Sequence, residues 1–158
     1  MTILGIDPGI ADTGYGIIEK KGGKFIFIEC GTIKTSAKQE LPQRLENLYK
    51  DLITIIKKYK PNQIGIEELF FAKNAKTAIT VSHARGVILL AAKSAKAEIR
   101  EFTPLQIKQA LTGYGRADKN QIQQMVKTVL NLNKIPKPDD AADALAIAIC
   151  SAQTNYVK

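Results

Sequence analysis

Four acidic residues stand at positions where they could share one task. Asp7 ends a first apolar run, immediately before a Pro-Gly pair, and Glu67 ends a second apolar run. Asp140 and Asp143 lie three residues apart in an alanine-rich segment, a spacing that places both on one face of a helix. No candidate set of Cys or His ligands accompanies them, and oxygen ligands of this kind suit Mg²⁺ or Mn²⁺.

Two such ions about 3.5 to 4 Å apart can activate a water on one side of a phosphodiester and stabilise the departing oxygen on the other. Asp7 would bridge the ions, and the other three acids would complete their shells. The acids together therefore predict a metal-dependent nuclease.

Each acid also has an ordinary structural explanation. Asp7 could simply open an Asp-Pro-Gly turn, and Glu67 could be a solvated loop residue. Acids in the first turn of a helix complement its dipole, which accounts for Asp139 and in part for Asp140 but not for Asp143. The sequence leaves open whether Asp139 or Asp140 is the better ligand.

Basic residues are concentrated in the second part of the chain. The net charge is +8, and from residue 69 onward thirteen Lys and Arg face six Asp and Glu, which gives +7 for this part. Lys108, Arg116 and Lys119 surround a glycine-containing loop, where the backbone could approach phosphate closely. The alternatives are a solvated lysine-rich surface and an ordinary turn between two helices.

An aromatic pair follows the second acidic strand end. Phe70 is flanked on one side by Lys73 and Lys76, so a protruding ring could stack on a base or wedge into a DNA junction. Core packing of the ring is the competing interpretation.

Apolar periodicity indicates the elements that position these residues. A hairpin and a third antiparallel strand open the chain, a helix leads to a strand parallel to the first, and further helices follow. The predicted strands cover residues 3–7, 14–18, 25–33, 63–68 and 97–102, and the predicted helices cover residues 41–59, 74–95, 104–111, 118–132 and 138 onward.

The predicted helix at residues 74–95 is apolar around most of its circumference. Such a helix is expected to be buried on two sides, one against the sheet and the other against a second copy of the chain. Its single His83 is expected to be a structural or surface residue.

The composition is that of a globular protein, with 45% apolar and 24% charged residues. The length of 158 residues suits one domain spanning residues 1–158. No apolar run is long enough for a membrane span, and no basic segment precedes an apolar one at the N-terminus, so a cytoplasmic location is expected. Cys30 and Cys150 are expected to be free thiols.

The order of motifs resembles the RuvC family of bacterial Holliday-junction resolvases over nearly the whole chain. The matching segments are Ile-Asp-Pro-Gly at 6–9, Thr-Gly-Tyr-Gly at 13–16, Ile-Glu-Glu-Leu-Phe-Phe-Ala-Lys-Asn at 66–74, Ala-Arg-Gly at 84–86 and Asp-Ala-Ala-Asp-Ala-Leu-Ala at 140–146. The resemblance implies an RNase H-like α/β fold with a mixed five-stranded sheet flanked by helices. It also implies a homodimer that resolves four-way DNA junctions by symmetric paired nicks in recombination and repair.

The resemblance also implies roles for individual residues. Asp7, Glu67, Asp140 and Asp143 correspond to the catalytic metal ligands of the family, although some members have histidine at the position of Asp140. Phe70 corresponds to the family's junction-contacting aromatic residue. Lys108 and Lys119 correspond to basic residues near the active site, and the implied partner proteins are RuvA and RuvB.

Three other functions compete with a junction-resolving nuclease. An RNase H-like nuclease of the YqgF type would act on RNA, and a junction-binding module would have lost cleavage. The Asp-x-Gly pattern also suggests an actin-like ATPase, but 158 residues leave no room for its two related subdomains.

Overall fold

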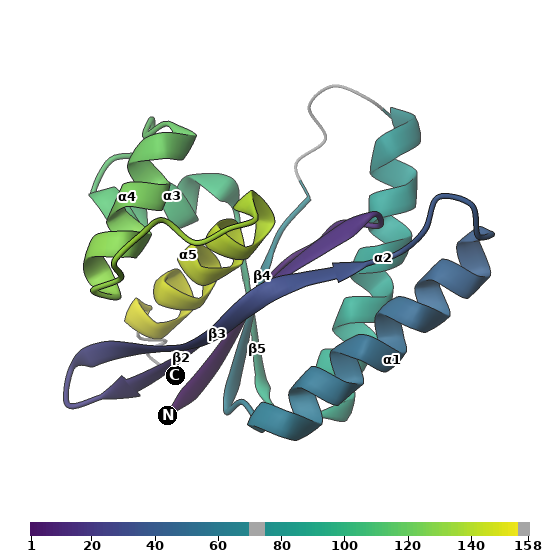
Figure 1. Cartoon of the computed structure of the whole chain (residues 1–158), viewed down its shortest axis with the longest axis horizontal. Helices are drawn as coiled ribbons and strands as arrows, with labels where there is room; N and C mark the ends of the chain where they lie inside the picture. The colour runs from purple at the N-terminus through teal and green to yellow at the C-terminus, as the bar shows by residue number, and fades with distance from the viewer. Residues whose placement is uncertain (70–74, 155–158) are drawn as a thin grey trace.

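The computed structural model describes residues 1–69 and 75–154. In these residues it contains five strands and five helices (Figure 1). In chain order the elements are β1 (Thr2–Asp7), β2 (Asp12–Lys21), β3 (Lys24–Lys34), α1 (Leu41–Tyr59), β4 (Gln63–Glu67), α2 (Ala75–Ser94), β5 (Glu98–Phe102), α3 (Pro104–Thr112), α4 (Lys119–Val129) and α5 (Asp139–Gln153).

The strands form one mixed sheet in the order β3-β2-β1-β4-β5. β1 pairs with β2 in antiparallel orientation and with β4 in parallel orientation. The α1 crossover allows this parallel pairing, as the sequence predicted. Ile6 lies opposite Ile66 in the register, so the next residues, Asp7 and Glu67, are neighbours at the ends of two central strands.

Helices cover both faces of the sheet. Figure 1 shows α3, α4 and α5 on one side and α1 and α2 on the other. Alternation along β1 divides its side chains between two apolar cores, since Ile3 packs with Leu145 of α5 while Leu4 and Ile6 pack with Leu48 of α1. Asp7 has the same parity as Ile3 and therefore faces α5.

Glycines on the strands allow α5 to lie almost on the backbone of the sheet. A Cβ atom at Gly5 would stand 2.0 Å from the carbonyl oxygen of Ala144, and one at Gly14 would stand 2.0 Å from that of Asp140. The small side chains of the alanine-rich α5 permit the same close approach from the helix side. Every residue of this helix from Ala144 to Ala152 is buried.

Two elements, β2 and α4, differ from their predicted ranges by more than one residue at an end. β2 spans ten residues, where the sequence predicted a strand only at residues 14–18. α4 ends at Val129 and not at residue 132, because Asn131 adopts a left-handed conformation with φ of 50° and the Leu132 N–H donates to the carbonyl of Lys127.

The remaining predictions on the chain concern cysteines, the histidine and membranes. Cys30 and Cys150 are free, as expected, and burial raises the pKa of the Cys150 thiol to about 11. His83 is exposed on α2. No helix in the described part of the chain has the length and apolar character that a membrane span requires.

Candidate active site

Asp7 and Glu67 form the centre of an acidic cluster on the α5 side of the sheet. Burial raises the pKa of Asp7 most, the negative charges of Glu67, Asp143 and Asp140 add to this effect in that order, and together they bring the pKa to about 8. Asp7 and Glu67 also share a hydrogen bond, and burial together with the charge of Asp143 raises the pKa of Glu67. The two strand ends therefore hold carboxylates that resist being ionised together.

α5 supplies the other two acids from above the sheet. The backbone of Asp140 rests on Gly14 of β2, and Asp143 follows one turn later. Burial raises the pKa of Asp143, Lys119 lowers it and the charge of Asp140 raises it. The other three predicted acids thus lie within electrostatic range of Asp7, and the four together come from three different elements.

Asp139 belongs to the edge of this cluster. Its carboxylate pairs with Lys137 at 2.8 Å and with Lys119 at 3.5 Å, and Lys137 lowers its pKa. Asp140, and not Asp139, is among the charges that act on Asp7. The structure therefore favours Asp140 over Asp139 as the fourth member of the cluster.

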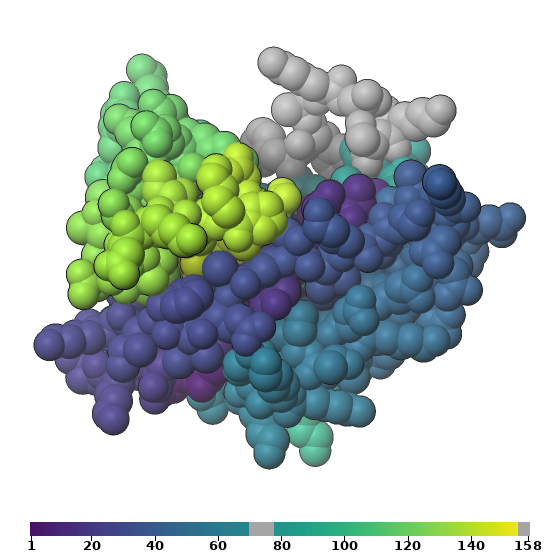
Figure 2. All heavy atoms as spheres, viewed as in Figure 1, coloured from purple at the N-terminus to yellow at the C-terminus, as the bar shows by residue number. Residues whose placement is uncertain are grey.

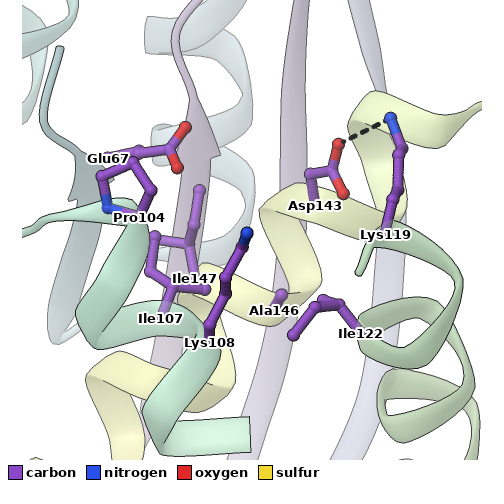
Figure 3. A pocket seen from close by; sticks show the side chains of 9 residues that line it. All are labelled: Glu67, Pro104, Ile107, Lys108, Lys119, Ile122, Asp143, Ala146 and Ile147. Carbon is purple, nitrogen blue, oxygen red and sulfur yellow. Dashed lines mark ion pairs between the residues drawn. The ribbon is translucent and has the colours of Figure 1, made fainter. Parts of the chain in front are cut away.

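A pocket of about 200 Å³ opens beside the acids (Figure 3). Glu67 and Asp143 stand on opposite sides of it, Lys108 rises between them, and Lys119 contacts Asp143 at 3.2 Å. Apolar side chains form the rest of the lining, from Pro104, Ile107, Ile122, Ala146 and Ile147. The pocket thus combines two anions and two cations on an apolar base.

The two lysines are positioned by short helices with well-formed N-termini. α3 begins with a capping box between Thr103 and Gln106, and α4 begins with one between Asp118 and Gln121. Lys119 is the first residue of α4, and its pKa is raised by Asp143 and Asp139 although partial burial opposes this. These caps fix where each cation enters the pocket.

The donor set fits a hard divalent cation, although the acids are not arranged around one. Among the residues that the structure describes, no three Asp, Glu, His or Cys side chains stand close enough together to hold an ion as they are. Asp143 forms an ion pair with Lys119 at 3.2 Å. Ion binding therefore requires side-chain rearrangement, and it would relieve the mutual repulsion that raises the pKa of Asp7.

Comparison with known proteins identifies the family. A family model described as "Crossover junction endodeoxyribonuclease RuvC" matches residues 3–151. The chain belongs to the RuvC family. The predicted family and its RNase H-like fold with a mixed five-stranded sheet are thereby confirmed.

Curated relatives match over almost their whole length. The crossover junction endodeoxyribonuclease RuvC of Halothermothrix orenii is 59% identical over 95% of this chain and 91% of its own. The protein of the same description from Clostridioides difficile is 57% identical over 100% of this chain and 94% of its own.

Solved structures agree with this result. The RuvC structure from Thermus thermophilus superposes with a TM-score of 0.88 at 35% identity, covering 96% of this chain and 93% of that one. A second structure is that of T. thermophilus RuvC in complex with Holliday junction substrate, again with a TM-score of 0.88. The yeast mitochondrial Holliday junction resolvase Ydc2, at 18% identity and a TM-score of 0.68, shares the fold.

The predicted DNA-binding residues of this RuvC-family chain fall into two groups. Lys108, Lys119 and the exposed Arg116 lie in or near the pocket on α3, α4 and the loop between them. Phe70, Lys73 and the side chain of Lys76 lie outside the part of the chain that the structure describes.

Sequence reasoning missed two exposed apolar residues near this pocket. Leu105 at the start of α3 and Tyr114 in the loop after it are 54% and 55% exposed. The available signal was an aromatic residue between two glycines, Gly113 and Gly115, in the loop predicted to approach phosphate.

Proposed function

We propose that this RuvC-family chain resolves four-way DNA junctions by hydrolysing one phosphodiester on each of two opposed strands, during homologous recombination and repair. The observation that carries the proposal is the mutual electrostatic contact of Asp7, Glu67, Asp140 and Asp143, beside Lys119 and Lys108. T. thermophilus RuvC with its Holliday junction substrate supports the choice of DNA.

The four carboxylates would hold two Mg²⁺ ions, for which Mn²⁺ would substitute. Bound there, the ions would supply an activated water and charge stabilisation for the departing oxygen. Asp7, at the centre of the cluster, would be shared between them, and the other acids would complete their shells. With burial and three like charges acting against its ionisation, Asp7 is the residue whose charge depends most on the ions.

The lysines would handle the negative charge of the substrate. Lys119 pairs with Asp143 in the free protein, and a phosphate entering the pocket would offer it a second anionic partner. Lys108 points into the same pocket and would contact the DNA backbone there (Figure 3). Arg116, exposed on the adjoining loop, would bind a neighbouring phosphate.

A homodimer would supply the second cleavage. Ile79 and Leu90 are 60% and 61% exposed on α2, and their separation of eleven residues places them on the same helix face. His83 and Gly86, also exposed, lie between them on that face. This stripe is the surface expected to pair with a second copy of the chain, so that two sites face two strands.

The remaining contacts are expected from the family. Phe70 would insert at the junction, with Lys73 and Lys76 on the flanking phosphates. The branch-migration proteins RuvA and RuvB would be the partners. We expect the enzyme to act on chromosomal DNA in the cytoplasm as one domain of residues 1–158.

The test is cleavage of a synthetic four-way junction and of a matched linear duplex, with Mg²⁺ or with EDTA. The wild type should make paired, symmetric nicks in the junction alone, and EDTA should abolish them. Asp7→Asn should bind the junction but not cut it. Asp12→Asn is the matched control, because Asp12 is an acid on the adjacent strand that pairs with Lys34 outside the cluster.

Other outcomes would support other functions. Equal cutting of junction and duplex would contradict junction selectivity. Cleavage of RNA but not of DNA would favour the YqgF-type nuclease. Junction binding without cleavage by the wild type, under every metal and sequence tested, would favour a binding module.

A further inference from the structure

A second pocket adjoins the acidic one on the far side of Lys108. Its volume is about 360 Å³, and it is lined by Thr103, Pro104, Leu105, Lys108 and Gly115. Pro104 and Lys108 line both pockets, so these two residues form the boundary between them. A ligand in the second pocket would therefore lie next to any group that Lys108 binds.

The second pocket is lined mainly by apolar groups, and the loop after α3 packs tightly against Leu105. The loop after α3 lies directly on Leu105, since a Cβ atom at Gly115 would stand 2.5 Å from the Leu105 Cδ1. Glycine thus allows the loop backbone to pass this side chain. The single charged residue in the described lining is Lys108, at the boundary with the acids.

Tyr114 is presented beside this pocket by a loop whose backbone is fixed. Gly113 takes the left-handed conformation that closes α3, and its N–H donates to the carbonyl of Gln109 at 2.8 Å. The Tyr114 N–H donates to the Thr112 hydroxyl oxygen at 3.2 Å, and that hydroxyl also lies 2.8 Å from the carbonyl of Lys108. An exposed ring on an ordered loop can bind a flat ligand at little cost in conformational entropy.

We propose that this pocket, with Tyr114 at its edge, seats the base of the nucleotide next to the phosphate that is cut. The proposal rests on the proposed function, because the acidic pocket must be where cleavage occurs. Lys108 would contact the phosphate, and the adjoining base would leave the stack of its strand to lie on the Tyr114 ring and against Leu105.

Charge and shape both suit a nucleotide. Lys108 lines the apolar surface, and the exposed Arg116 directly follows Gly115 of its lining in the chain, so a base in the pocket would have one cation at its boundary and a second on the adjoining loop. Aromatic side chains stack on the face of any base, so such a contact adds affinity whatever the sequence.

The experiment is a double-mutant cycle that combines one change in the protein with one change in the DNA. Junctions carry an abasic residue on either side of the cut phosphate, and their kcat/KM values are measured with wild type and Tyr114→Ala. We expect removal of one flanking base to lower the wild-type value about tenfold, and to have little further effect with Tyr114→Ala. If the two effects multiplied instead, base and ring would act independently and the proposal would be wrong.

Two variants control for indirect effects. Tyr114→Phe keeps the ring and should keep the abasic sensitivity of the wild type. Ile26→Ala removes an exposed apolar side chain on β3, an element that does not line either pocket in the described part of the chain. This variant should behave as wild type with both substrates. A loss of abasic sensitivity in Tyr114→Phe or Ile26→Ala would contradict stacking on this ring.

A binding measurement separates this proposal from the proposed function. A junction with 2-aminopurine at the flanking position is titrated with protein in EDTA, where no cleavage is needed. Its fluorescence should change with wild type and Tyr114→Phe but not with Tyr114→Ala. Identical changes for all three proteins would overturn the base pocket, even if Asp7→Asn had abolished cleavage as expected.

Discussion

The four acids and the two lysines come from elements of different character, and Glu67 and Asp143 meet Lys108 and Lys119 in one pocket. Asp7 and Glu67 end central strands of the sheet, and Asp140 and Asp143 lie on α5, whose backbone touches strand glycines. Lys108 and Lys119 lie on short helices that form a separate group on the surface beside α5, coloured green in Figure 2.

This difference corresponds to two physical demands. Groups that must share ions need fixed relative positions, because divalent cations impose strict distances and geometry. Groups that attract a polyanion act over a longer range and tolerate motion. Placing the acids on buried backbone and the lysines on exposed helices meets both demands in one pocket.

The largest effect on stability and cleavage is expected from a substitution that disturbs the packing of α5, the helix that carries Asp140 and Asp143, on the sheet. Gly5→Ala would drive a methyl group into the backbone of α5, 2.0 Å from the Ala144 oxygen. We expect the free energy of unfolding to fall by about 3 kcal/mol or more, with loss of cleavage. The measurement is urea denaturation followed by circular dichroism.

Gly86→Ala is the matched control for the stability of the single chain, measured at a protein concentration low enough to avoid the pairing proposed for this face of α2. In the described part of the chain, no atom other than the local backbone and the chain neighbours lies within 4 Å of a Cβ at Gly86, which is within α2. Alanine is favoured over glycine in a helix by about 1 kcal/mol, so this variant should be slightly more stable. Equal losses of stability in both variants would contradict the close contact of α5 with β1.

Substitution of a lysine in the pocket should slow cleavage and leave the folding of the chain intact. Lys119→Met removes the partner of Asp143, and we expect junction cleavage to slow about a hundredfold, as when one group that stabilises the transition state is lost. Lys137→Met removes an exposed lysine that pairs with Asp139 but not with Asp143, and should retain most activity. Equal rates for the two variants would disprove a special role for Lys119.

A third prediction concerns the pH dependence of stability without metal. The pKa of Asp7 is about 8 in the folded protein and 3.8 ordinarily, so between these values the folded state binds more protons than the unfolded one. The free energy of unfolding should therefore fall as the pH rises from about 4 to about 8.

Asp7→Asn should remove this pH dependence. At pH 8 in EDTA we expect the variant to be more stable than wild type by about 1 to 3 kcal/mol, given about 1.4 kcal/mol per pKa unit and a titration shared with neighbouring acids. Mg²⁺ should raise the melting temperature of wild type and not of Asp7→Asn. A variant less stable than wild type at pH 8 would contradict repulsion within the cluster.

The smallest effect is expected at the start of α4. Asp118→Ala removes the side chain that accepts from the Gln121 N–H at 2.9 Å, and should cost about 1 kcal/mol of stability with a modest loss of cleavage. Asp118→Asn keeps a good cap and should match wild type. A large loss of cleavage in Asp118→Asn would mean that the carboxylate itself acts in the site.

Much of this arrangement could be predicted from the sequence, since strong periodic signals mark the strands and helices. The chain runs from β1 through β2, β3 and α1 before it returns to form β4 parallel to β1, and this return brings the two strand ends together, so Asp7 and Glu67 could be paired in advance. The spacing of Asp140 and Asp143 already placed them on one helix face.

Other features depend on contacts that no local pattern encodes. Asp140 was preferred over Asp139 only after α5 had been placed on Gly14, because both acids fit the first turn of a helix. The boundary shared by two pockets at Lys108 likewise requires the packing of α3 against the loop at Gly115. Tertiary contacts, which sequence spacing does not specify, decide both features.

The first and last elements of the chain both contribute to the acidic cluster, and this has a consequence for protein synthesis. A growing chain that has not yet reached α5 carries Asp7 and Glu67 but neither Asp140 nor Asp143. The strand glycines then face solvent in place of the helix that covers them. A partly synthesised molecule therefore lacks half of its proposed ligands, and the proposed two-ion site cannot form before α5 has been made.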